Sequence, residues 1–207
     1  MEEYYPVSLQ LKGKVVVVIG GGKIAERKIK GLLNTGAKIE LISPTITEGL
    51  KGLVEATKIK WLEKSFSPED VNDAFLILAA TNDRATNQAV QQAVNPYQLL
   101  NLADQHEESN FIIPSVMRRG KLNIAVTTSG ASPTLSKQIK KQLEETYDER
   151  YESYIDFLFR CRQYVLKHVS DTQQKKKILS SLVDDPIYFK SVNRDALFLE
   201  LLHQDLD

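Results

Sequence analysis

Residues 15–25 read Val-Val-Val-Val-Ile-Gly-Gly-Gly-Lys-Ile-Ala, and this stretch decides the fold. Five β-branched apolar residues in a row predict a strand that is buried on both faces. Apolar residues at helical spacing follow over 25–33, so the glycines lie at a strand-to-helix turn. A dinucleotide pyrophosphate binds at such a turn, because the free N–H groups of the first helical turn meet its negative charge.

The small residues of this turn have separate expected roles. Gly20 allows the tight turn, Gly22 lets the backbone approach the phosphates, and Ala25 takes the position where the helix packs on the strand. The motif is short, and a plain glycine-rich turn is the alternative. Its place directly between a predicted strand and a predicted helix favours the nucleotide site.

Strand and helix signals alternate along the first hundred residues. The predicted strands are 14–19, 38–43, 58–62, 75–80 and 98–103, and the predicted helices between them are 23–34, 47–56 and 83–94. This order predicts a parallel sheet with right-handed crossovers and helices on both faces.

The pattern changes after the fifth predicted strand. Two apolar runs, 111–117 and 121–127, flank a hairpin-like junction and predict an antiparallel ribbon that can pair with a second copy of the chain. Ser132 and Pro133 then suit the cap and the first position of a helix.

The remainder of the chain, from about residue 148, reads as helix. The expected fold class is α/β: a Rossmann-type parallel sheet, then an antiparallel dimerisation ribbon, then a small all-helical C-terminal domain. The corresponding domains are 1–110, 111–147 and 148–207.

Composition excludes several classes of protein. The 207 residues carry 27 basic and 27 acidic side chains, and this balance argues against nucleic-acid or membrane-surface binding. No apolar run approaches the roughly 20 residues that span a bilayer. A single cysteine, Cys161, and an N-terminus too polar for an export signal predict a cytoplasmic protein. The three histidines lack metal-ligand spacing, so no metal site is expected.

Polar residues follow two predicted strands at the edge of the sheet where ligands bind. Ser43, Pro44 and Thr45 stand where an acidic residue usually holds the adenosine ribose, so the two hydroxyls are candidate ribose contacts and the choice between NAD and NADP stays open. A simple Ser-Pro turn is the alternative. Thr81 and Asn82 are expected to border the cofactor, to cap the next helix, or both.

Asp104 follows the fifth predicted strand at the same edge. A carboxylate there can accept a proton while hydride leaves, or orient a substrate N–H; a turn cap is the alternative. Farther along, residues 127–133 combine several hydroxyls with a helix N-terminus, which suits an anionic group such as a carboxylate. Arg119 adds positive charge nearby in the sequence.

The sequence resembles the precorrin-2 dehydrogenase family of sirohaem biosynthesis. That family includes free-standing dehydrogenases, a bifunctional dehydrogenase/ferrochelatase and the N-terminal part of sirohaem synthase. Five blocks, in the family's order over the first 145 residues, carry the resemblance: Gly20-Gly21-Gly22-Lys23-Ile24-Ala25-Glu26-Arg27-Lys28, Ala79-Ala80-Thr81-Asn82-Asp83, Asn101-Leu102-Ala103-Asp104, Phe111-Ile112-Ile113-Pro114-Ser115 with Arg119-Gly120, and Ser129-Gly130-Ala131-Ser132-Pro133-Thr134-Leu135.

The resemblance implies a homodimer that oxidises precorrin-2, a tetrapyrrole, to sirohydrochlorin with NAD, and it places the family's key aspartate at Asp104. The implied NAD contacts are Gly22, Lys23, Ile24, Pro44 and Thr45, and the implied substrate loop includes Thr128, Ser129, Gly130 and Ser132.

One departure from the family concerns metal chemistry. Ser109-Asn110 stands where many members have Cys-Asp, which inclines the interpretation toward a dehydrogenase without metal insertion. Two alternatives stay open: a bifunctional enzyme that also inserts Fe²⁺, and a non-catalytic dinucleotide-sensing regulatory module whose helical tail binds a partner.

Overall fold

The structure is a computed structural model that describes residues 4–103 and 106–206. The chain forms two compact units that divide between Ile113 and Pro114, and each unit is described by itself. The expected domain boundaries at residues 110 and 147 stay predictions.

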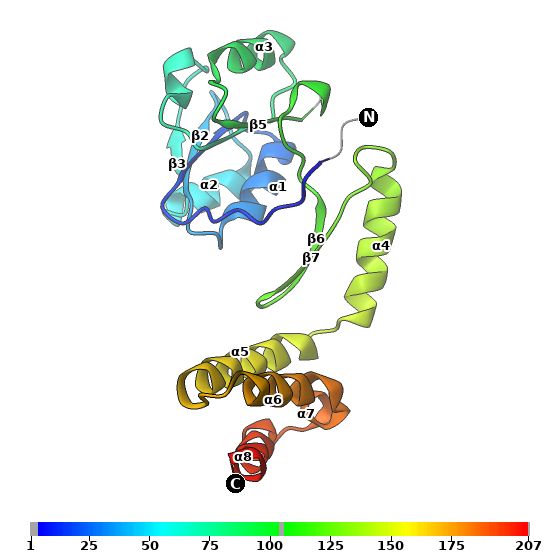
Figure 1. Cartoon of the computed structure of the whole chain (residues 1–207). Coiled ribbons are helices and arrows are strands. Elements are labelled where there is room, and N and C mark those ends of the chain that lie inside the picture. Colours follow the sequence, from blue (N-terminus) through cyan, green and yellow to red (C-terminus); the bar gives the residue numbers. More distant parts are fainter. Residues whose placement is uncertain (1–3, 104–105, 207) are drawn as a thin grey trace. The chain divides into compact units, whose positions relative to one another are not determined.

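A five-stranded parallel sheet forms the centre of the first unit. In the described residues it contains β1 (Val15–Ile19), β2 (Lys38–Ile42), β3 (Lys60–Leu62), β4 (Leu76–Ala79) and β5 (Leu99–Leu102) in the order β3-β2-β1-β4-β5. Ile19 pairs with both Ile42 and Ala79, so the strands end at one level. This sheet and its helices confirm the expected fold class (Figure 1).

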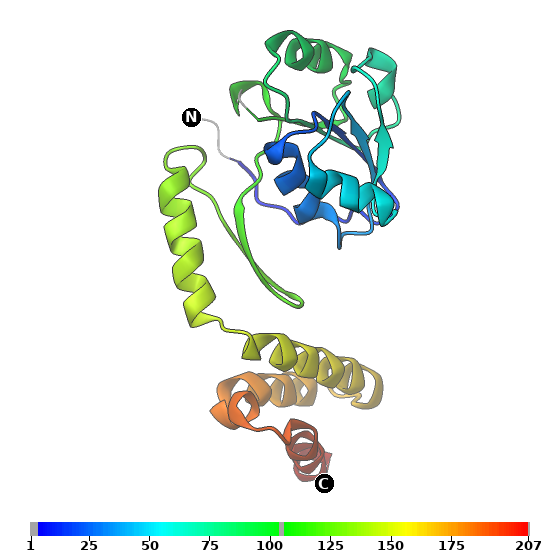
Figure 2. The same ribbon diagram turned by 180° about the vertical axis from the view of Figure 1, so that it is seen from behind.

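Helices cover both faces of the sheet. α1 (Lys23–Leu32) and α2 (Glu48–Glu55) lie on one side, and α3 (Arg84–Ala93) lies on the other (Figures 1 and 2). Because successive strand residues point to opposite faces, Val16 and Val18 join the core with α1, whereas Val17 joins the core with α3.

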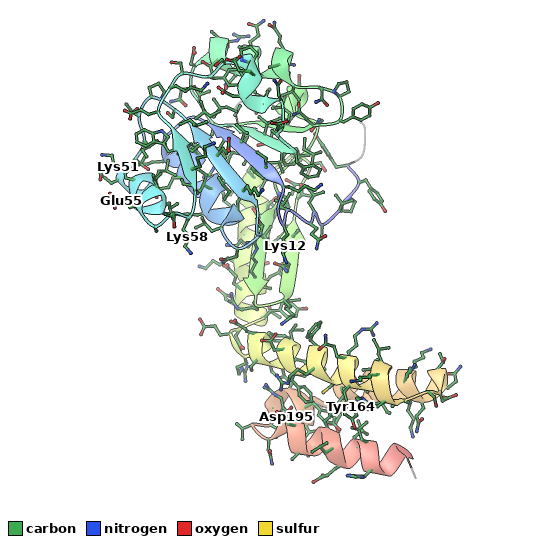
Figure 3. The ribbon with its side chains drawn as sticks, turned by 90° about the vertical axis from the view of Figure 1, so that its left-hand side faces the viewer. Lys12, Lys51, Glu55, Lys58, Tyr164 and Asp195 are labelled. Atoms are coloured by element: carbon green, nitrogen blue, oxygen red, sulfur yellow. The ribbon has the colours of Figure 1, made fainter. Side chains whose placement is uncertain are left out.

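The outer side of α2 is charged. Lys51 and Glu55 are exposed and project away from the sheet (Figure 3). The helix therefore has the amphipathic pattern of a surface element that packs on a sheet by one face.

The second unit opens with an antiparallel ribbon, β6 (Ser115–Arg119) and β7 (Leu122–Val126), on which α4 (Pro133–Thr146) packs. The ribbon was expected from residue 111, and it begins four residues later. Pro114 lacks the N–H that a ladder needs, and Phe111 packs in the core of the first unit instead.

Four helices complete the second unit: α5 (Arg150–His168), α6 (Thr172–Asp184), α7 (Pro186–Lys190) and α8 (Arg194–Leu206). Their shared core is rich in aromatic side chains, with Phe157 fully buried and edge-on to Phe198. Figure 3 labels Tyr164 and Asp195, which lie on α5 and α8; Asp195 pairs with Arg160 at 3.0 Å. No helix in the described part of the chain is long and apolar enough to cross a membrane.

Candidate active site

The switch point of the sheet lies between β1 and β4. From β1 the chain adds β2 and β3 on one side, and then crosses over to add β4 and β5 on the other. The carboxyl ends of β1 and β4 therefore border the crevice in which open α/β sheets bind ligands. The glycine turn, residues 20–22, leaves β1 at this point and leads into α1.

Gly20 and Gly22 differ in what surrounds them. Gly20 has φ +107°, and a Cβ there would lie 2.5 Å from the carbonyl oxygen of Ala80, so only glycine fits. A Cβ on Gly22 would meet no described atom within 4 Å. Among the described residues of the first unit this space is open, and the expected contact of Gly22 with a pyrophosphate stays a prediction.

Gly21 has a role that the sequence analysis missed. A Cβ on Gly21 would lie 1.9 Å from the carbonyl oxygen of Thr45, and the Gly21 carbonyl accepts a hydrogen bond from Thr47 N at 3.0 Å. The turn thus packs directly against the loop that follows β2. The only signal in the sequence was a third consecutive glycine where the motif requires two.

The N-terminus of α1 has no side-chain cap within the first unit's described residues, because Gly22 occupies the cap position. By contrast, side chains of Thr47, Asp83 and Ser132 cap α2, α3 and α4. Lys23 is exposed at the first position of α1, and Ile24 is half-buried. The first turn of α1 therefore presents backbone donors to the open space beside Gly22, and Lys23 adds positive charge at the same end of the helix.

The loop after β2 is shaped by its own hydrogen bonds. Ser43 is buried, its hydroxyl donates to the carbonyl of Thr45 at 2.7 Å, and its carbonyl accepts from Trp61 Nε1 at 2.9 Å. Pro44 and Thr45 are exposed. Ser43 thus holds the turn in shape, and Thr45 presents the exposed hydroxyl of the loop; their contacts with a ribose stay predictions.

A nearby carboxylate braces this loop. Glu26 on α1 accepts from the Thr47 hydroxyl at 2.7 Å and from Lys30 Nζ at 2.5 Å. These hydrogen bonds, that of Lys30 first, lower the pKa of Glu26. Glu26 therefore stays ionised at neutral pH and ties α1 to the start of α2.

The loop after β4 resolves the alternatives for Thr81 and Asn82. Asp83 caps α3, accepting from Ala85 N at 3.2 Å and from Thr86 N at 3.1 Å, so the capping interpretation of the two preceding residues is wrong. The Thr81 hydroxyl accepts from Asp83 N at 2.9 Å, and Asn82 is exposed. Both residues stay predicted cofactor neighbours.

Hydrogen bonds from the Thr86 hydroxyl and from the helix backbone lower the pKa of Asp83. The cap therefore remains a carboxylate at neutral pH.

Asp104 lies outside the described residues, so its predicted role stays a prediction. The strand before it is well anchored: Asn101 is buried and accepts a hydrogen bond from Lys28 Nζ on α1 at 2.7 Å. Burial, with a smaller effect of the charge on Arg27, lowers the pKa of Lys28 to about 8. The sequence analysis did not single out Lys28, because nothing local links positions 73 residues apart.

The hydroxyl-rich loop lies in the second unit and is partly an internal network. Thr128 Oγ1 accepts from Ser132 N at 2.9 Å and lies 3.3 Å from Ser136 Oγ. Ser129 and Gly130 are exposed, with φ +50° and +90°. Ser129 is thus exposed at the turn. Its positive φ is a backbone conformation that is unfavourable for residues other than glycine.

Arg119 also has an intramolecular partner in the second unit. Its guanidinium donates to the carbonyl of Glu144, near the end of α4, at 3.2 Å. It holds the ribbon to α4, and its predicted substrate contact stays a prediction. Within the part of the chain that the structure describes, no three His, Cys, Asp or Glu side chains gather as a metal site.

Comparisons with known proteins agree with this geometry. Residues 7–115 match the family described as "Putative NAD(P)-binding", residues 119–146 match "Sirohaem biosynthesis protein central", and residues 151–196 match "SirC C-terminal domain". A precorrin-2 dehydrogenase of Priestia megaterium is 37% identical over 97% of this chain and 98% of its own length. The chain belongs to the precorrin-2 dehydrogenase family.

Other members of the precorrin-2 dehydrogenase family extend the match. A precorrin-2 dehydrogenase of Bacillus subtilis is 34% identical over 76% of this chain and 98% of its own length. The solved structure of SirC, a precorrin-2 dehydrogenase, superposes with a TM-score of 0.84 at 36% identity, covering 97% of this chain and all of that one. The expected family, enzyme class (an NAD-dependent oxidoreductase) and NAD cofactor are thereby confirmed.

Proposed function

We propose that this protein oxidises precorrin-2 to sirohydrochlorin in sirohaem biosynthesis, with NAD⁺ as the hydride acceptor. The observation that carries the proposal is the end-to-end similarity to precorrin-2 dehydrogenases, including one solved structure. The uncapped glycine turn at the switch point supplies the physical basis for the cofactor. Neither the metal-inserting variant nor the regulatory module is favoured by these similarities.

The first unit holds the cofactor in this proposal. Gly22 and Lys23, at the first turn of α1, would hold the pyrophosphate. Thr45 would contact the adenosine ribose, and Thr81 and Asn82 would border the cofactor on the side of β4. When NAD⁺ is bound it accepts the hydride, and the protein's part is to orient the two reactants and to receive the proton.

Asp104 is the proposed proton acceptor. Oxidation of the reduced tetrapyrrole removes a hydride and a proton, and the carboxylate of Asp104 would take the proton. The substrate's own carboxylates suit the exposed Ser129 and the backbone donors of the loop 128–132. The proposal includes a homodimer, built through the ribbon, that acts in the cytoplasm.

The test is an assay with precorrin-2 and NAD⁺ that follows the absorption spectrum of sirohydrochlorin. Asp104→Ala is expected to lower turnover by about 10²- to 10⁴-fold, the usual contribution of a general base, with NAD⁺ affinity retained in calorimetry. Asp104→Asn is expected to be similarly slow, because an amide accepts no proton at neutral pH. A folded Asp104→Ala protein with the wild-type rate would remove Asp104 from the mechanism.

A further inference from the structure

The loop after β2 lacks the charged residue by which dinucleotide-binding sheets commonly distinguish NAD from NADP. In such sheets a carboxylate after the second strand binds the ribose 2′-hydroxyl, or an arginine there accommodates the 2′-phosphate of NADP. Here the loop 43–47 contains neither an acidic nor a basic residue. Glu48 follows it, but its side chain is 87% exposed and pairs with Lys51 on the same helix at 2.6 Å. A charge that selects between the two cofactors must therefore come from another element.

Glu26 brings a carboxylate to this loop from α1. Its Oε2 accepts a hydrogen bond from the Thr47 hydroxyl at 2.7 Å, and Thr47 N donates to the carbonyl of Gly21 at 3.0 Å. The Glu26 side chain is only 18% exposed, although it belongs to the first turn of a surface helix. The carboxylate thus lies one hydrogen bond from the loop 43–47 and close to the glycine turn.

Gly49 makes room for the Glu26 carboxylate. It is the second residue of α2, and a Cβ on it would lie 2.6 Å from the Glu26 carboxyl carbon and 2.9 Å from Oε2. A larger residue at position 49 would therefore displace the carboxylate. The place that Gly49 leaves free is also favourable for a negative charge, because it adjoins the N-terminal turn of α2.

The N-termini of α1 and α2 differ in what they offer to an anion. α1 begins after Gly22 and has no side-chain cap among the described residues of the first unit. The first turn of α2, by contrast, has the Thr47 hydroxyl as its cap and the Glu26 carboxylate bound to that hydroxyl. A phosphate therefore meets free backbone donors at α1 and a negative charge at α2.

Lys30 is the charge partner of Glu26. Its Nζ lies 2.5 Å from Glu26 Oε1, so the pair as a whole is close to neutral. Loss of the carboxylate would leave the ammonium group of Lys30 without this partner. A single substitution at Glu26 therefore changes the charge beside the loop from neutral to positive, and a positive charge is what favours a bound phosphate.

We propose that Glu26 is a specificity-determining residue for the cofactor: it supplies from α1 the negative charge that the loop after β2 lacks, and it thereby favours NAD⁺ over NADP⁺. The proposal rests on the proposed function, in which the loop 43–47 holds the adenosine ribose. Glu26 opposes the 2′-phosphate by its charge, and Gly49 keeps the carboxylate in place. A purely structural brace would instead change the affinity for both cofactors equally.

Glu26→Gln tests the role of the charge, because glutamine keeps the shape and an acceptor for the Thr47 hydroxyl. Calorimetric titration gives the dissociation constants of NAD⁺ and NADP⁺ for each folded protein. We expect the wild type to bind NADP⁺ more weakly, and we expect the ratio of the NADP⁺ constant to the NAD⁺ constant to fall by about tenfold in Glu26→Gln, the effect of one charge at close range. An unchanged ratio would overturn the proposal.

Gly49→Ala tests the same position without any change of charge. The added methyl group displaces the carboxylate, and alanine suits a helix better than glycine, so the variant is expected to fold. The ratio of dissociation constants should fall as it does in Glu26→Gln. Combining the two substitutions should lower it little further, because both act through the same carboxylate. Independent, multiplicative effects would contradict the proposal.

Two substitutions elsewhere on α2 are the matched controls. Gly52→Ala adds the same methyl group where a Cβ meets no described atom within 4 Å. Glu55→Gln removes the same charge from the other end of the helix, where Glu55 is exposed (Figure 3). Neither should change the ratio. A shift in either control equal to that of Glu26→Gln would overturn the assignment to Glu26.

Binding constants separate this proposal from the proposed function, because they require no tetrapyrrole. A protein that selects NAD⁺ through Glu26 and does not oxidise precorrin-2 would overturn the proposed reaction and leave the specificity residue in place. A wild type that oxidises precorrin-2 and binds both cofactors equally well would overturn the role of Glu26 alone.

Discussion

Gly22 borders the open space where an added side chain would meet a bound pyrophosphate. We predict that Gly22→Asp folds normally and loses NAD⁺ binding, because the new carboxylate brings both bulk and like charge to the phosphate position. Calorimetric titration with NAD⁺ measures the loss. Gly52→Asp is the control, since Gly52 lies exposed on α2 and also has open space around it. Equal NAD⁺ affinity in both variants would contradict the assigned turn.

Lys28 gives the stability of the fold a pH dependence. Its pKa is about 8 in the folded protein and 10.5 in its ordinary state, so between these values the unfolded chain binds more protons. Stability therefore rises with pH in this window. We predict that the unfolding free energy of the wild type, minus that of Lys28→Met, increases from pH 8 to pH 10 in urea titrations. A constant difference across the window would show that Lys28 is not buried as described.

The turn role that the sequence predicted for Gly20 is a local one. Gly20 was expected from the turn that joins adjacent elements, and the structure gives it positive φ and a close neighbour. Lys28 and Asn101 were missed as a pair, because their hydrogen bond joins a helix to a strand far along the chain. Asp83 was noted only as part of the block 79–83. Its role as the cap of α3 becomes clear only once the first residue of that helix is known.

Thr47 joins two helices beside the cofactor loop. Its hydroxyl caps α2, accepting from Leu50 N at 3.3 Å, and donates to Glu26 on α1 at 2.7 Å. We predict that Thr47→Val, which keeps the shape and removes both bonds, lowers the unfolding free energy by about 1 kcal/mol, the usual value of a lost cap. NAD⁺ affinity should also fall, because the loop 43–47 loses its brace.

Thr47→Ser provides the control for this prediction, because it keeps the hydroxyl. Chemical denaturation and calorimetry on the two variants give the comparison. If Thr47→Ser loses as much stability as Thr47→Val, keeping the hydroxyl does not preserve stability, and the prediction would be contradicted.

Elements were predictable where one local signal dominates. β1 and β4 are short continuous apolar runs, and such runs are typical of strands buried on both faces. The bounds of α7 were not predictable, because this five-residue helix begins at the proline of an Asp-Pro pair that is equally typical of a connection. The start of β6 was predicted too early, because the apolar residues 111–113 have the pattern of a strand. In the structure, Phe111 packs against the core of the first unit instead.

The ribbon is the part of the second unit through which we expect a partner chain to bind. Met117 is fully buried on the face toward α4, so Val116 and its neighbour across the ladder, Ala125, lie on the opposite face. Ala125 is exposed and Val116 is half-buried. A two-stranded ribbon also has two unpaired edges, which a second copy can pair or cover.

We predict that the protein is a homodimer, with twice the chain mass of 23.4 kDa by light scattering at micromolar concentration. Val116→Arg should convert it to a folded monomer, because a cation would then have to be buried without a partner in a symmetric interface. Val192→Arg is the matched control: Val192 is fully exposed between α7 and α8, and the same substitution there should leave the dimer intact. A monomeric wild type would contradict the dimer. A Val116→Arg protein that stays dimeric, with normal circular dichroism, would instead place the interface away from the ribbon.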